Sequence, residues 1–144
     1  MRVDSYFSTL LVIFYQHKMP YFRFSRLTMY KPGTHIIATL ECPENRLLVS
    51  CTEFKIVTNQ LIQQYGLHKL GEVYHDFQPA GYTGVICLSE SHISVHTWPE
   101  YNRLNMDIYL SNHERTNDIT VQKIYEEYVR FFEAEILNLQ TIIR

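Results

Sequence analysis

The chain has 144 residues, a mass of 17.2 kDa and a formal net charge of -2 at pH 7, which suits a single domain. This charge balance gives no electrostatic reason to expect nucleic acid or a membrane surface as a partner. The three cysteines follow no CxxC or other metal-type spacing, so we expect reduced thiols, no metal and a cytoplasmic location.

The apolar and charged residues among the first 28 positions follow no clear helical or strand period. Tyr6–Tyr15 is apolar but too short to span a bilayer, and no cleavage site of a secretory signal follows it. The sequence therefore predicts a poorly specified extension over residues 1–28, with Met19 and Met29 as alternative starts, and one domain over residues 29–144. A peripheral membrane anchor is the less favoured alternative for the extension.

Regular patterns begin with a strand and a helix. Residues 34–42 are rich in β-branched side chains and are bounded by proline and glycine, which predicts a strand. Ser50 and Glu53 have the spacing of a capping box. The apolar residues that follow recur at helical intervals until Gly66, which predicts a helix over residues 52–65.

Further strand-like segments follow, separated by turn residues. The predicted strands are residues 67–77 with a bend at Gly71, residues 85–90 and 92–98 on either side of Ser91, and residues 103–111.

Near the C-terminus the period becomes helical again. One long helix with a single apolar face is predicted from Val121, Ile124, Tyr128, Phe132, Ile136 and Leu139. The order β-α-β-β-β-β-α lacks alternating βαβ units and a glycine-rich phosphate loop. It predicts an α+β two-layer sandwich, in which an antiparallel sheet has two helices packed on one face.

Chemically active side chains gather in residues 88–101, which read LSESHISVHTWPEY. His92 and His96 lie on one side of a strand, but no cysteine or acidic residue stands at a familiar zinc spacing. A second interpretation is a Ser-His-acid hydrolase formed by Ser91, His96 and Glu100, but the sequence around Ser91 lacks the GxSxG motif of such enzymes. These three residues also lie too close along an extended chain to bond one another.

A third interpretation concerns the bond between Glu90 and Ser91. A serine hydroxyl can attack the preceding carbonyl, form an ester and then be eliminated, which leaves a new C-terminus and, after hydrolysis, a pyruvoyl group. The reaction needs a strained peptide, groups that transfer protons and donors for the oxyanion. Ser91, His96 and Thr83 are residues of the required types.

The segment HDFQPAGYTGVICLSESHISVHTWPEY, continued by NMDIYLSN, resembles the bacterial and archaeal S-adenosylmethionine decarboxylases. The similarity runs from Gly33 to about Phe132, and ESHISVHTWPE is its most specific part. The resemblance implies a two-layer α+β sandwich and self-cleavage of a proenzyme. It also implies a homodimer of processed protomers with active sites shared across the interface.

The resemblance also implies roles in processing. Cleavage would fall between Glu90 and Ser91, and Ser91 would become a pyruvoyl cofactor that forms a Schiff base with the substrate amine. His96 matches the family's processing histidine. Thr83 stands where a serine hydroxyl assists that histidine.

Other positions match substrate contacts of the family. Phe77 matches the aromatic residue that stacks on adenine, and an aromatic face also suits a sulfonium cation. Glu100 matches the carboxylate that accepts hydrogen bonds from the ribose. Backbone groups of Glu90 would contact the adenine edge.

The chain departs from the family near the end of the last predicted strand. Asp107 is present, but Ser111 replaces the cysteine that donates a proton to the product, and Asn112 replaces a glycine. A hydroxyl is a far weaker acid than a thiol. Arg103 adds a cation near the substrate end, and Cys87 lies four residues before Ser91.

Three hypotheses follow from these matches and departures. The first is decarboxylation of S-adenosylmethionine to supply aminopropyl groups for spermidine. The second is a pyruvoyl-dependent decarboxylase of another amino acid, such as arginine or ornithine. The third is a catalytically impaired regulatory homologue. Phe77 and Glu100 favour the first over the second, because an amino acid without adenosine needs neither residue, whereas Ser111 is the main support for the third.

Overall fold

A computed structural model describes residues 29–144, so the predicted extension over residues 1–28 lies outside the described residues. Six antiparallel strands form one sheet in the order β2-β3-β4-β5-β1-β6. The strands are β1 (Thr34–Glu41), β2 (Lys69–Asp76), β3 (Tyr82–Leu88), β4 (Ser91–Trp98), β5 (Arg103–Leu110) and β6 (Glu135–Ile143). The helices are α2 (Arg46–Val49), α3 (Thr52–Gln64), α4 (Asp118–Phe131) and the 3-10 turn η1 (Pro99–Tyr101).

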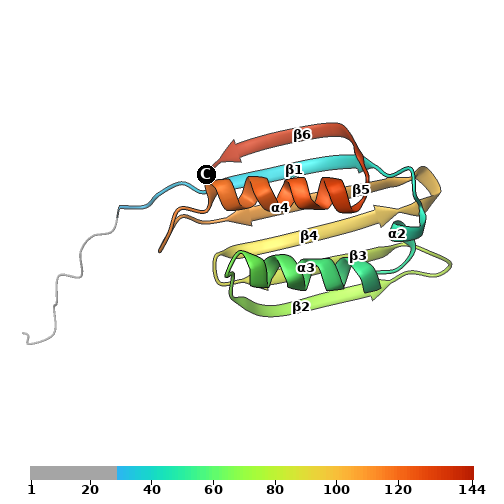
Figure 1. The fold of residues 1–144 in the computed structure, drawn as a ribbon, viewed down its shortest axis with the longest axis horizontal. Helices are drawn as coiled ribbons and strands as arrows, with labels where there is room; N and C mark the ends of the chain where they lie inside the picture. The colour runs from blue at the N-terminus through green and yellow to red at the C-terminus, as the bar shows by residue number, and fades with distance from the viewer. Residues whose placement is uncertain (1–28) are drawn as a thin grey trace, which may run out of the picture.

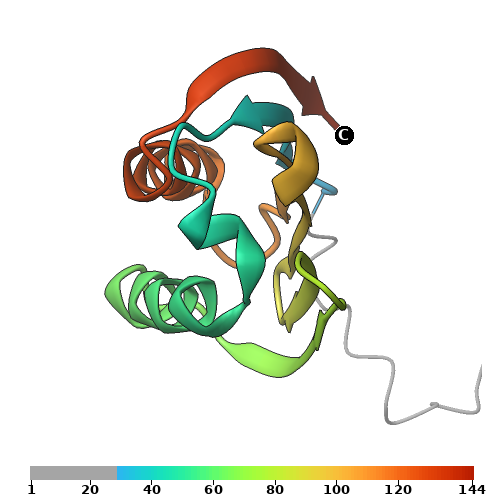
Figure 2. The same cartoon turned by 90° about the vertical axis from the view of Figure 1, so that its right-hand side faces the viewer.

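The helices cover one face of this sheet. Figure 1 shows α3 over β2 and β3 and α4 over β1 and β5, and Figure 2 shows the helices on the same side of the strands. This arrangement confirms the predicted α+β two-layer sandwich. The opposite face, which we call the open face, has no helix of residues 29–144 on it.

The core lies between the sheet and the two long helices. Phe54 of α3 stacks on Tyr128 of α4 with ring centroids 5.2 Å apart, and the Thr58 and Tyr128 hydroxyls lie 2.8 Å apart. The strands bury alternate residues beneath these helices, as in β5, where Leu104 and Met106 are fully buried. Burial of one side of each strand leaves the other side for polar and reactive groups.

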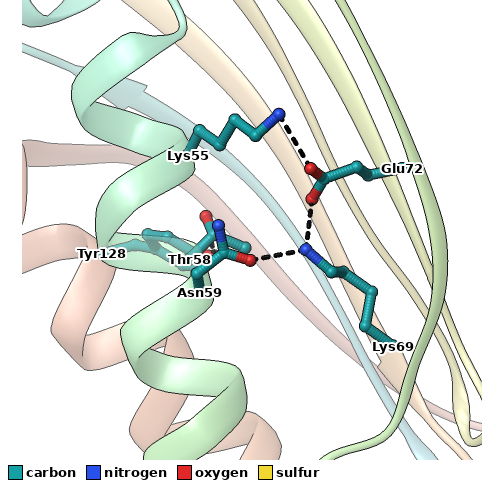
Figure 3. A network of polar contacts seen from close by, with 6 residues as sticks. All are labelled: Lys55, Thr58, Asn59, Lys69, Glu72 and Tyr128. Carbon is teal, nitrogen blue, oxygen red and sulfur yellow. Dashed lines mark hydrogen bonds and ion pairs between the residues drawn. The ribbon is translucent and has the colours of Figure 1, made fainter.

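Polar side chains also join α3 to the edge strand β2 (Figure 3). The Glu72 carboxylate pairs with Lys55 at 2.8 Å and with Lys69 at 2.7 Å, and Lys69 donates to Asn59 at 2.6 Å. Hydrogen bonds from Lys55 and Lys69 lower the pKa of Glu72 below its ordinary value. These contacts fix α3 on β2, at the opposite edge of the sheet from β6.

The prediction of one long C-terminal helix is wrong. Helix α4 ends at Phe131, Glu133 adopts a left-handed φ of 48°, and the chain returns as β6. The Ala134 N–H donates to the Val129 carbonyl at 2.9 Å, which closes the last turn. The residues after Glu133 bond to the free edge of β1, and this sheet pairing overrides their helical spacing.

The predicted capping box of α3 is also wrong, although the helix bounds are confirmed within one residue. Asp76 of β2 caps the start of the helix instead. Its carboxylate accepts a hydrogen bond from the Cys51 N–H at 2.8 Å and one from the Ser50 hydroxyl at 3.1 Å. Glu53 pairs with Arg46. A partner that lies 25 residues away replaced the local one.

Candidate active site at the two ends of strand β4

The Glu90–Ser91 bond lies in the tight hairpin between β3 and β4. These strands pair up to Leu88 and Ser91, so only Ser89 and Glu90 form the connection. Ser91 has a φ of 150°, in a region that residues with a Cβ rarely adopt and that costs about 1–3 kcal/mol. The peptide predicted to be cleaved is therefore adjacent to backbone strain.

The Glu90 carbonyl and the Ser91 hydroxyl, the two groups that would react in cleavage, each have a hydrogen-bond partner. The Ser111 N–H donates to the Glu90 carbonyl oxygen at 2.9 Å, where it can stabilise a developing oxyanion. The Ser91 hydroxyl lies 3.1 Å from Nδ1 of His92. This end of β4 thus holds a hydroxyl beside an imidazole, and a carbonyl that accepts from a backbone N–H next to a residue of unusual φ.

A small cavity of about 130 Å³ lies beside this hairpin and includes Glu90 and Ser111 in its lining. The Glu90 carboxylate accepts from the Ser89 hydroxyl at 2.7 Å and pairs with Arg115 at 3.5 Å. His113 lines the same cavity. The structure therefore brings Ser111 to Glu90, as the predicted site requires, and places two cationic or titratable residues with them.

Asn112, where the resemblance led us to expect a glycine, connects three segments behind the site. Its amide donates to the Pro32 carbonyl at 2.6 Å and to the Asp118 carboxylate at 3.0 Å, and its oxygen accepts from the Asn117 N–H at 2.7 Å. Asp118 also accepts from Thr34 at 2.6 Å. These bonds hold the end of β5 against the start of α4, so the departure at Asn112 has a structural explanation.

The other end of β4 carries the remaining predicted residues. Thr83 and His96 are cross-strand neighbours, and the Thr83 hydroxyl lies 2.7 Å from Nδ1 of His96. His96 lines a cavity of about 360 Å³ together with Phe77 and Glu100. Trp98 lies in the same lining. The structure thus brings together the predicted adenine platform, the ribose carboxylate and the processing histidine.

The two ends do not meet within one chain. His96 lies five positions after Ser91 on the same strand, and at about 3.3 Å per residue this separates them by roughly 16 Å. Strand β4 runs the length of the sheet (Figure 1). Residues 29–144 of a single chain therefore hold Thr83 and His96 apart from Ser91.

Sequence reasoning missed a third cluster on the open face. His35 of β1 lies 3.2 Å from the Asp107 carboxylate of β5, which also accepts from Ser94 at 3.5 Å. The ring of His92 lies 6.1 Å from that of His35. The signal that could have found this cluster is the period of two, which places all four residues on the face away from the core.

Burial is the main cause that lowers the pKa of His92, and the neighbouring His35 adds to it. Asp107 acts in the opposite direction but does not reverse the shift. His92 is therefore neutral at neutral pH, and an imidazole with its hydrogen on Nε2 leaves Nδ1 free to accept the Ser91 hydroxyl hydrogen.

Comparison with solved structures supports the fold described above. A crystal structure titled as the adenosylmethionine decarboxylase of Aquifex aeolicus superposes with a TM-score of 0.66, covering 81% of this chain and 91% of that one at 23% identity. The chain thus has the fold of that protein, a two-layer α+β sandwich.

Sequence comparison gives the family. The sequence model of the S-adenosylmethionine decarboxylase family matches residues 34–144, and the chain belongs to that family. A relative from Archaeoglobus fulgidus is 33% identical over 103 residues, which are 72% of this chain and 88% of the relative. One from Picrophilus torridus is 36% identical over 107 residues, 72% of this chain and 82% of the relative. Both relatives are named S-adenosylmethionine decarboxylase proenzyme.

Two features are absent from the described part of the chain, a membrane-spanning helix and a cluster of metal ligands. Within residues 29–144, no helix has the length and apolar character needed to cross a membrane. The same residues contain no group of three or more His, Cys, Asp or Glu side chains arranged to hold a metal ion.

Proposed function

We propose that this chain is a proenzyme that cleaves itself between Glu90 and Ser91 and then decarboxylates S-adenosylmethionine. The observation that carries the proposal is the β3–β4 hairpin of a family member, in which the Ser111 N–H bonds the Glu90 carbonyl, the next residue, Ser91, has an unusual φ, and the Ser91 hydroxyl contacts His92. The product would supply aminopropyl groups for spermidine. The free cysteines of the described residues support a reducing, cytoplasmic location.

The cofactor of this reaction would come from the chain itself. A pyruvoyl group derived from Ser91 supplies a carbonyl that can take up the substrate amine and accept the electrons released when CO₂ leaves. The residues around Ser91 fit its formation, because cleavage of the preceding bond needs a hydroxyl, a proton acceptor and an oxyanion donor. Ser91, His92 and the Ser111 N–H provide these groups.

The cavity at the far end of β4 fits an adenosine. Phe77 and Trp98 are each about half exposed, at 47% and 46%, so their rings are accessible. Aromatic faces suit both a nucleobase and a sulfonium cation. The Glu100 carboxylate in the same lining can accept hydrogen bonds from two ribose hydroxyls.

A homodimer would unite the two ends of β4. A two-fold axis makes each interface residue meet the same patch of the other copy. It can therefore place the Ser91 end of one chain beside the His96 end of the other and complete two sites. The open face offers the contact surface, because Val73 and Val85 are 72% and 46% exposed there. We propose that Thr83, His96, Phe77 and Glu100 act across this interface.

Ser111 occupies the position of the expected proton donor. Its backbone N–H keeps the contact with the Glu90 carbonyl, and that contact does not depend on the side chain. A hydroxyl delivers a proton poorly, so we propose that self-cleavage is intact and that turnover is slow. The names of the relatives favour S-adenosylmethionine over arginine or ornithine.

The test is the mass of the denatured protein before and after treatment with S-adenosylmethionine and cyanoborohydride. We expect two fragments, residues 1–90 and 91–144, with the substrate adduct on the second. The Ser91→Ala variant is the control and stays whole. A single uncut wild-type chain under all conditions would contradict the proposal, and cleavage without an adduct would contradict the choice of substrate.

A further inference from the structure

The Ser91 hydroxyl and the His92 imidazole are in contact within one chain. Ser91 Oγ lies 3.1 Å from His92 Nδ1, a hydrogen-bond distance. The other histidine of β4, His96, lies roughly 16 Å further along the strand. Within the described residues, the imidazole that reaches the reacting hydroxyl is therefore the neighbour of Ser91 and not the residue at the family's processing position.

Aromatic and imidazole rings hold His92 in this position. The ring of Tyr109 lies 6.2 Å from that of His92, and the ring of His35 lies 6.1 Å from it. His35 is itself fixed at 3.2 Å from the Asp107 carboxylate. Both neighbouring rings are steeply inclined to the His92 ring, at 76° and 62°, so the imidazole packs edge-to-face against two rings beside Ser91.

The environment of His92 keeps the imidazole neutral. Partial burial and the nearby His35 both lower its pKa, Asp107 raises it, and Arg144 lowers it further. The titratable and charged groups that face it come from β1, β3, β5 and the chain after β6: His35, Cys87, Asp107, Tyr109 and Arg144. A neutral imidazole is the form that can accept a proton.

We propose that His92 is the base of the first step of self-cleavage, an inference that rests on the proposed function. The Ser91 Oγ–H proton moves to His92 Nδ1 while Oγ bonds to the Glu90 carbonyl carbon. The oxyanion on Glu90 accepts from the Ser111 N–H. The C–N bond then breaks, its electron pair goes to the Ser91 nitrogen, and that nitrogen takes the proton back from His92.

This step rearranges the chain without adding or removing an atom. It yields an ester between the Glu90 carbonyl and Ser91 Oγ, a free amine on Ser91 and a neutral His92. The later loss of the Ser91 Cα proton is a separate step, for which His96 would be available in the proposed homodimer. The two histidines of β4 are thus assigned to successive proton transfers.

The test follows cleavage of the full chain made by cell-free translation, with denatured masses taken over time and across pH. Hydroxylamine is added to parallel samples because it cuts an ester but not a peptide. We expect wild-type cleavage to speed up as pH rises through the lowered pKa of His92 and then to level off. His92→Gln should cleave at least about 100-fold more slowly, lose this inflection and accumulate no hydroxylamine-sensitive ester, because formation of the ester then limits the rate.

His68→Gln is the matched control and should behave as wild type. It removes an exposed imidazole that belongs neither to the two ends of β4 nor to the cluster on the open face. His92→Ala with added imidazole separates chemistry from folding, since a free base can enter the vacated space and restore cleavage. Wild-type speed and pH profile in His92→Gln would overturn the inference while the proposed function stands. Slow cleavage of His92→Ala without rescue would also overturn it, and an uncut wild-type chain would overturn both.

Discussion

The two ends of β4 differ in how they are built. At the Ser91 end the important groups are backbone atoms and their immediate neighbours, packed around a cavity of about 130 Å³. At the His96 end, side chains from the β2–β3 connection, β4 and η1 line a cavity of about 360 Å³. The first arrangement suits bond cleavage, which needs fixed geometry, and the second suits binding of a flat ligand. The comparison places the first bond-breaking step at one end of β4, and ligand recognition together with the second proton-transfer residue, His96, at the other.

Replacing the nucleophile is the strongest test of this separation. Ser91→Ala removes the hydroxyl that attacks Glu90, so self-cleavage should be lost completely, as measured by the denatured mass. The Ser50→Ala control removes a hydroxyl at the start of α3 and should cleave as wild type does. Cleavage of the Ser91→Ala chain at the same bond would show that another group is the nucleophile.

Changing the aromatic platform tests the other end. Phe77→Ala should raise the KM for S-adenosylmethionine about 10- to 100-fold, because loss of base stacking costs about 1–3 kcal/mol. Self-cleavage should proceed at the normal rate, and Phe77→Trp should keep KM near the wild-type value. A large loss of cleavage in Phe77→Ala would break the separation, since recognition and chemistry would then depend on the same residue.

Placing a thiol at position 111, where the resemblance led us to expect a cysteine, sharpens the comparison at the Ser91 end. Ser111→Cys should raise kcat about tenfold and increase the number of turnovers before inactivation, because a thiol gives up a proton more readily than a hydroxyl. Ser111→Ala keeps the backbone N–H and should still cleave itself. Equal kcat in the serine, cysteine and alanine forms would show that the proton comes from elsewhere.

The smallest expected effect concerns the support of the Ser91 end. A Cβ on Gly33 would lie 2.3 Å from the Leu110 carbonyl oxygen, next to Ser111. Gly33→Ala should therefore lower the free energy of unfolding by about 1–3 kcal/mol, as measured by urea denaturation. Gly71→Ala is the matched control, since no atom lies within 4 Å of its added Cβ. An equal decrease in the free energy of unfolding in both variants would show that the close contact at Gly33 does not limit stability.

Much of the fold could be predicted because alternation and turn residues are local signals. The strands from Thr34 to Leu110 and the helix that begins at Thr52 follow from them. The strand β6 could not be predicted, since its formation depends on the free edge of β1, about a hundred residues earlier in the chain. The predicted cap of α3 was wrong for the same reason, because the residue that caps the helix, Asp76, belongs to another element.

The residue types of the candidate site come from the sequence, whereas its geometry does not. The ESH signature predicts Ser91 as the pyruvoyl precursor, and the strand register places Thr83 opposite His96. The role of His92 depends on a contact between adjacent side chains at an unusual φ, which strand periodicity does not predict. The cluster of His35 and Asp107 needs β1 beside β5, which is a property of the sheet order.

The position of the Glu90–Ser91 bond has a consequence for assembly. A cut there leaves β1, β2 and β3 in one fragment and β4, β5 and β6 in the other. Strand β1 lies between β5 and β6, and β3 pairs with β4, so the fragments are interleaved and remain bound after the covalent link is gone. Folding is unimolecular before the cut, but refolding of separated fragments would be bimolecular and dependent on protein concentration. The fold of the cleaved protein would therefore depend on folding of the intact precursor, because the intact chain folds to this structure far more readily than its two fragments associate to form it.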